Sequence, residues 1–219
     1  MEPHCAVDFL QQQSSSRLFM AAWFRVDLNQ VVEGIKTHTA FDLTTNVIIA
    51  NQREIGEHPE VFPGLAKWLE EAGMAAATKE TLVHFDQDAL GYRHIIEYVS
   101  SLCKGCEENK ERAASAGMIQ ILVRILLAME KSTRAHNDID QIGLNQLDFR
   151  SGVILLGMIC VGTEAHIDVL CQALDGDVNV ARRLLEPHVG TAVTLAGHDE
   201  IASLLDTVCS PMIKSSGRH

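Results

Sequence analysis

The chain carries an internal repeat with a period of 57. When it is shifted by that distance, segment 90–105 (LGYRHIIEYVSSLCKG) lies opposite segment 147–162 (LDFRSGVILLGMICVG). The matched positions are Leu90 with Leu147, Tyr92 with Phe149, Arg93 with Arg150, Ile96 with Val153, Val99 with Leu156, Leu102 with Ile159, Cys103 with Cys160 and Gly105 with Gly162. The preceding apolar segment aligns in the same register, Leu65 with Leu122 and Leu69 with Leu126. One register that aligns two separate segments indicates a helical repeat, because each unit buries its apolar face only by stacking on its neighbours.

Apolar residues recur at three- and four-residue steps along most of the chain, which is the spacing of one helix face. Helices are expected over residues 18–35, 63–72, 90–103, 118–129, 144–160, 165–174, 178–185 and 199–208. Gly73 is expected to end the second of these. Residues 42–51 fit either a short helix or a strand, and the polar segment 130–141 is expected to be an exposed loop or insertion. Aromatic residues make up only 5% of the chain, and such an aliphatic core favours an all-α fold over a β-sandwich.

A single helical domain is expected over residues 17–209. A chain of 219 residues is long enough for one large domain. Residues 1–16 form a polar lead-in that ends in three glutamines and three serines, and residues 210–219 form a short polar tail. Because segments of this composition bury little apolar surface, both are expected to be flexible.

The net charge of −11 and the pI of about 5.3 describe an acidic surface. Such a surface repels phosphate backbones, so nucleic acid is not expected as a partner. No stretch approaches the roughly 18 consecutive apolar residues that span a bilayer, so direct insertion into a membrane is not expected either.

Six cysteines are spread along a chain that does not open with a basic and then apolar leader; they are Cys5, Cys103, Cys106, Cys160, Cys171 and Cys209. In a domain of this size they are expected to be free thiols in a reducing compartment rather than a disulfide framework. The expected location is the cytoplasm. A mitochondrial location stays open, because residues 17–25 are amphipathic and flanked by arginines.

Several short patterns contain the residue types of catalytic or metal sites. Cys103 and Cys106 have CxxC spacing, but zinc would need two further ligands and a thioredoxin-like site would need a βαβ context. The repeat register instead places Cys103 and Cys160 at equivalent core positions. The pairs His84 with Asp86 and His166 with Asp168 are two residues apart and do not face one another on a helix. No nucleotide-binding loop is found, so no catalytic, cofactor or metal residue is predicted.

The run GYRHIIEYVSSLCKGCEENKERAASAGMIQILVRILLAM resembles the third helix of one armadillo repeat followed by the first two helices of the next. The resemblance is clearest over residues 90–129, and segment 58–69 is similar to an earlier repeat. It implies a short right-handed armadillo/HEAT-like superhelix of two to three degenerate repeats with extra terminal helices. The period of 57 exceeds the usual ~40–47 residues, so each unit is expected to carry an insertion, most visibly at 130–141.

The resemblance also indicates where a partner would bind. Peptide-binding armadillo proteins carry a ladder of Trp and Asn on the third helix, and the aligned positions here are Glu97, Ser101, Ile154 and Met158, so that ladder is absent. The two third-helix stripes are nevertheless the candidate partner-binding residues: Arg93, Glu97, Ser101, Lys104, Arg150, Ile154, Met158 and Val161. The first stripe is polar and the second largely apolar. The apolar stripe fits either a partner-binding patch or a surface covered by a C-terminal helix.

The expected function is that of a non-catalytic scaffold or adaptor that binds another protein, as a subunit of a larger assembly. The alternative is a helical enzyme whose active site uses scattered His, Asp and Glu residues. A deep pocket lined by His84, His94 or His166 with carboxylates would favour the enzyme. A shallow groove or flat patch around Ile154 and Met158 would favour the adaptor.

Overall fold

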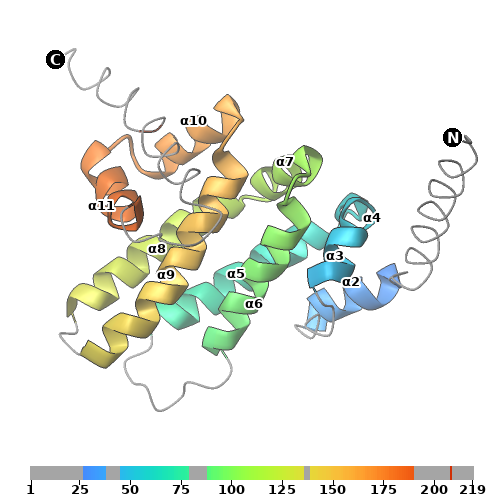
Figure 1. The fold of residues 1–219 in the computed structure, drawn as a ribbon, viewed down its shortest axis with the longest axis horizontal. Coiled ribbons are helices and arrows are strands. Elements are labelled where there is room, and N and C mark those ends of the chain that lie inside the picture. The colour runs from blue at the N-terminus through green and yellow to red at the C-terminus, as the bar shows by residue number, and fades with distance from the viewer. Residues whose placement is uncertain (1–26, 38–44, 79–87, 136–138, 190–207, 209–219) are drawn as a thin grey trace, which may run out of the picture.

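The computed structural model describes residues 27–37, 45–78, 88–135, 139–189 and Val208. The helices there are α2 (Leu28–Thr37), α3 (Thr45–Ala50), α4 (Gln52–Glu57), α5 (Val61–Thr78), α6 (Asp88–Cys103), α7 (Glu107–Ser115), α8 (Met118–Ala135), α9 (Ile139–Cys160), α10 (Glu164–Ala173) and α11 (Val178–Val189) (Figure 1). No strand occurs in this part of the chain, so the all-α prediction is confirmed. The expected lead-in 1–16, the tail 210–219 and nearly all of the expected helix 199–208 lie outside the described residues.

The register of the sequence repeat reappears in the helix boundaries. Helices α5 and α8 begin 57 residues apart, at Val61 and Met118, and also end 57 residues apart, at Thr78 and Ala135. Helices α6 and α9 end at the matched residues Cys103 and Cys160. Gly105 and Gly162 follow those ends with positive φ angles of 69° and 94°, a conformation that glycine adopts without strain. A unit of one short helix and two long ones therefore occurs twice, as α4–α5–α6 and α7–α8–α9, and α10 and α11 begin a third.

Two local predictions are wrong. Most of segment 130–141 is helical and not a loop, since α8 continues to Ala135 and α9 begins at Ile139; residues 136–138 lie outside the described residues. The extra length of each unit therefore lies largely in long helices. Gly73 does not end its helix, since α5 runs on to Thr78. Its missing side chain instead lets α8 approach, because a Cβ there would lie 2.3 Å from Cδ1 of Ile125. The ambiguous segment 42–51 forms helix α3 from Thr45.

The four longest helices, α5, α6, α8 and α9, lie side by side at the centre of the molecule (Figure 1). Helices α2–α4 lie toward one end of this group and α10–α11 toward the other. The repeat positions Leu65, Leu69, Leu122 and Leu126 are all completely buried between them. Each such leucine contributes roughly 1.5–3 kcal/mol of transfer free energy, so the positions that define the repeat are also the core.

A buried side chain of α7, the short first helix of the second unit, forms hydrogen bonds with the neighbouring helices. The amide Nδ2 of Asn109 donates to the carbonyl oxygens of Gln52 and Leu102, both at 2.8 Å. Its Oδ1 accepts a hydrogen bond of 2.8 Å from Nη1 of Arg112. Asn109 is the third residue of α7 and is fully buried. One side chain thereby joins α4, α6 and α7.

His166 occupies the same place in the next unit, as the third residue of α10. Its Nδ1 lies 2.9 Å from the carbonyl oxygen of Ile159, which corresponds to Leu102 in the preceding unit. Its Nε2 lies 2.9 Å from Oε2 of Glu111 on α7. We call the contacts of Asn109 with Leu102 and of His166 with Ile159 the junction hydrogen bonds, since each joins a first helix to the third helix before it.

The equivalence of the two junctions gives a testable expectation. His166→Asn should lower the free energy of unfolding by less than about 1 kcal/mol, because asparagine already makes this bond at the earlier junction. His166→Ala should cost about 1–3 kcal/mol, because the buried carbonyl of Ile159 then loses its donor. Urea denaturation of both variants measures the difference. Equal losses for the two substitutions would contradict the equivalence.

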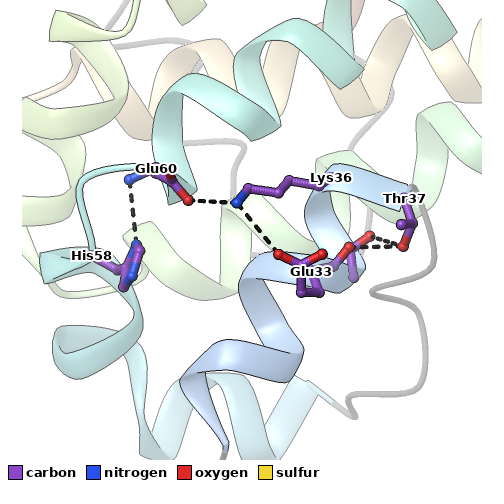
Figure 2. Close-up of polar contacts among 6 residues, drawn as sticks. Glu33, Lys36, Thr37, His58 and Glu60 are labelled. Carbon is purple, nitrogen blue, oxygen red and sulfur yellow. Dashed lines mark hydrogen bonds and ion pairs between the residues drawn. The ribbon is translucent and has the colours of Figure 1, made fainter.

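An exposed charge cluster joins α2 to the start of α5 (Figure 2). Nζ of Lys36 lies 2.9 Å from Oε2 of Glu60 and 3.4 Å from Oε1 of Glu33. The hydrogen bond from Lys36 lowers the pKa of Glu60, so this contact stabilises the fold above the usual carboxyl range and is lost as the pH falls through the lowered pKa. Both partners are about half exposed, and ion pairs of this kind contribute little to stability.

Candidate protein-binding groove

A groove of about 540 Å³ lies over α6, between α3 and α9. Helix α9 contributes Ser151, Ile154 and Met158, which follow one another at steps of three and four residues and so share one face of the helix, and Val161 directly follows the helix. Helix α6 contributes Ile96, Glu97, Ser100 and Ser101, and α3 contributes Thr45 and Ile49. Lys104 and Gly105, which directly follow α6, and Lys110 on α7 complete the lining.

Six of the eight residues that the sequence singled out for partner binding line this groove: Glu97, Ser101, Lys104, Ile154, Met158 and Val161. They lie on α6 and α9 or directly after these helices, at positions that the repeat register relates. Ile154, Met158 and Val161 are each only partly buried. The groove thus has mainly charged and hydroxyl side chains on the α6 side and mainly apolar ones on the α9 side.

The other two residues, Arg93 and Arg150, do not line the groove. Arg93 forms an ion pair with Asp148 on α9, whose side chain is almost completely buried. Burial raises the pKa of Asp148, and the hydrogen bond from Arg93 opposes that rise. Nε of Arg150 is buried without a hydrogen-bond partner among the described residues. Arg93 therefore connects α6 to α9 and, although its side chain is still 30% exposed, it does not belong to the groove surface that the sequence predicted.

Of the charged side chains that line the groove, some form ion pairs with neighbouring residues and others do not. Within the described residues, no side chain forms an ion pair with Glu97 or Lys104. Lys110, by contrast, has Nζ 2.7 Å from Oε1 of Glu107. The hydroxyl of Ser101 donates to the backbone oxygen of Glu97 at 2.8 Å, so it is already satisfied within α6. In this part of the chain, two unpaired charges of opposite sign thus lie along one side of the groove.

Sequence reasoning missed the α3 side of the groove. Ile49 is 37% exposed and, with Met74, is one of two large hydrophobic residues exposed to this degree among the described residues. It lies in the segment whose secondary structure was ambiguous, and the repeat alignment did not extend there. The β-branched run at 47–49 was the available signal, but it does not say which of its residues faces outward.

Three of the residues that could have indicated chemistry, Cys103, Cys160 and His166, are buried in the core. Burial raises the pKa of the Cys103 thiol to about 12, and that of Cys160 likewise to about 12, so both remain thiols at neutral pH. No group of three or more His, Cys, Asp and Glu side chains within the described residues could hold a metal ion. His166 makes a junction hydrogen bond, His94 is exposed, and His84 lies outside the described residues.

Comparison of the chain with protein-family models, with curated protein sequences and with solved structures gives no significant match. Among the helices described, none is by itself long and apolar enough to cross a membrane. The sharply bent pair Glu107–Ser115 and Met118–Ser132, at 68°, meets that criterion only when the two are taken together.

Proposed function

We propose that this protein is a non-catalytic scaffold or adaptor, a subunit of a larger assembly, and that its groove holds a segment of another protein. Its helices would form a short right-handed armadillo/HEAT-like superhelix. The observation that carries the proposal is the groove itself, because six residues chosen for partner binding from two sequence stripes line one cavity. The free thiols of the described cysteines favour a reducing compartment such as the cytoplasm.

The position of the groove within the repeat supports a protein partner. Helix α6 is the last helix of one unit and α9 is the last helix of the next. Each of these successive units therefore contributes one row of side chains to the same groove surface. Stacked helical repeats create extended binding surfaces in this way. The apolar side chains of Ile154 and Met158, with the exposed Ile49, provide contact area that a polar small molecule would not use.

A pair of matched substitutions tests the proposal. Ile49 and Met74 are equally exposed, at 37%, but only Ile49 lines the groove. Ile49→Asp should weaken partner binding at least about tenfold, because it places a charge against the partner's apolar surface, whereas Met74→Asp should leave binding unchanged. The measurement is quantitative mass spectrometry of the proteins that co-purify from native lysate with the wild-type chain and with each variant.

Met158→Asp supplies a second test from the opposite side of the groove. It should retain the wild-type far-UV circular dichroism and lose the same stoichiometric partner. If Met158→Asp unfolds the protein, the α9 stripe is core and not interface. If the partner survives both groove substitutions, or is lost equally with Met74→Asp, the groove is not the binding site.

A further inference from the structure

We propose that the groove selects its partner by the order of charges along an extended segment. The segment would carry a basic side chain for Glu97, an acidic side chain for Lys104, and apolar side chains between them. This inference rests on the proposed function, since it describes what the same groove binds. It adds a chemical class of partner and a fixed direction of binding.

The first support is the spacing of the two unpaired charges. Glu97 and Lys104 are seven residues apart along α6 and its C-terminal end, which corresponds to about 10.5 Å along the helix axis. Both line the groove, and neither has an ion pair within the described part of the chain. Between them lies Ser101, whose hydroxyl already donates within α6. The polar side of the groove therefore offers a partner two charges of opposite sign, one near each end.

The second support is the apolar surface that accompanies those charges. In the repeat register, Ile154 corresponds to Glu97 and Met158 to Ser101, so apolar side chains of α9 lie along the same length of groove. Ile49 adds an apolar side chain from α3. A segment that fits must bring apolar side chains to these residues and still present charges to α6.

The length of the charged side of the groove fits a short extended segment. In an extended chain of polyproline II geometry, which has three residues per turn, residues three positions apart point to the same side and stand about 9 Å apart. Three residues therefore cover the distance between Glu97 and Lys104, and the two charges of the partner should stand three positions apart.

Selection from a peptide library tests the charge order directly. A displayed library of random dodecapeptides, supplemented with twelve-residue tiles of this chain's own sequence, is selected on the full-length protein. Peptides enriched on the wild type should carry a basic and an acidic residue three positions apart, in one constant order, with apolar residues between. The double variant Glu97→Lys with Lys104→Glu should enrich the opposite order.

Individual peptides from the two selections supply the quantitative measurement. A peptide selected on the wild type should bind the double variant about fivefold more weakly, which is the scale of two solvent-exposed ion pairs. Added salt should reduce the difference, because exposed charges are screened. Ile49→Asp and Met158→Asp serve as groove-blocking controls, so that either one remains usable if the other alters the circular dichroism.

The outcomes separate this inference from the proposed function. If no enriched peptide depends on Ile49 or Met158, the groove does not bind segments of other proteins and both proposals fail. If enrichment depends on the groove but charge order is random, or is the same on both proteins, only the charge-order inference is overturned. Dominance of this chain's own tiles would assign the groove to a second copy or to the chain itself, and would overturn the choice of a different protein.

Discussion

Replacing Asn109 with alanine is expected to lower the free energy of unfolding by about 3 kcal/mol, from the loss of several buried hydrogen bonds. The substitution removes two hydrogen bonds to the carbonyl oxygens of Gln52 and Leu102 and the acceptor for Arg112. Each lost bond costs about 0.5–1.5 kcal/mol, and a buried group left without a partner costs about 1–3 kcal/mol. For a chain of this length the loss corresponds to a fall in Tm of roughly 6–12 °C. Urea denaturation and thermal melting measure both quantities.

The matched control for Asn109 is Asn179, which lies on α11 and is less buried. Asn179→Ala should change the free energy of unfolding by no more than about 0.5 kcal/mol, as is usual for surface positions. A loss at Asn109 as small as that at Asn179 would mean that the hydrogen bonds of the Asn109 side chain do not hold α4, α6 and α7 together.

The second large effect is expected at Gly152, where α9 packs against Tyr92 of α6. A Cβ at Gly152 would lie 2.5 Å from the hydroxyl oxygen of Tyr92 and 3.1 Å from Cδ2 of Leu126. Gly152→Ala should therefore cost about 1–3 kcal/mol from overpacking. Alanine gains about 1 kcal/mol of helix propensity over glycine, which offsets only part of that cost.

Tyr92→Phe should rescue Gly152→Ala. The Tyr92 hydroxyl is completely buried and has no hydrogen-bond partner among the described residues, so its removal leaves no group there unsatisfied and makes room for the new methyl group. In a double-mutant cycle the two substitutions should couple favourably by about 1–2 kcal/mol. Additive losses would contradict the contact. The single variant Tyr92→Phe, which should be close to neutral, is the control.

The core and the register were predictable from sequence because both are periodic. Leu65 and Leu122 are related by the same shift that relates the helix ends at Cys103 and Cys160. Helical repeats bury equivalent residues in each unit, so matched apolar positions identify core positions without any knowledge of the packing. The polar and apolar sides of the groove followed from the same alignment.

Contacts between polar residues of different helices were not predictable in this way. Arg93 belongs to a polar stripe, and helix periodicity gives the face on which a residue lies but not whether a carboxylate 55 residues away will meet it. Asn109 stands in the acidic run Glu-Glu-Asn-Lys, which resembles a solvated connection. The one available signal was that the repeat register carries Asn109 onto His166, a second polar residue that can donate a hydrogen bond.

Gly105 and Gly162 each lie inside a junction, and the spacing of the junctions sets the number of residues by which such a chain could be extended. Each junction keeps its donor and acceptor within one short stretch of chain, from Leu102 to Asn109 and from Ile159 to His166. Duplication of one whole period would therefore copy a complete junction. An insertion of different length between the two partners would separate them and leave a buried carbonyl unpaired. Evolution or design can thus lengthen this array in whole periods, adding one more stripe to the groove each time.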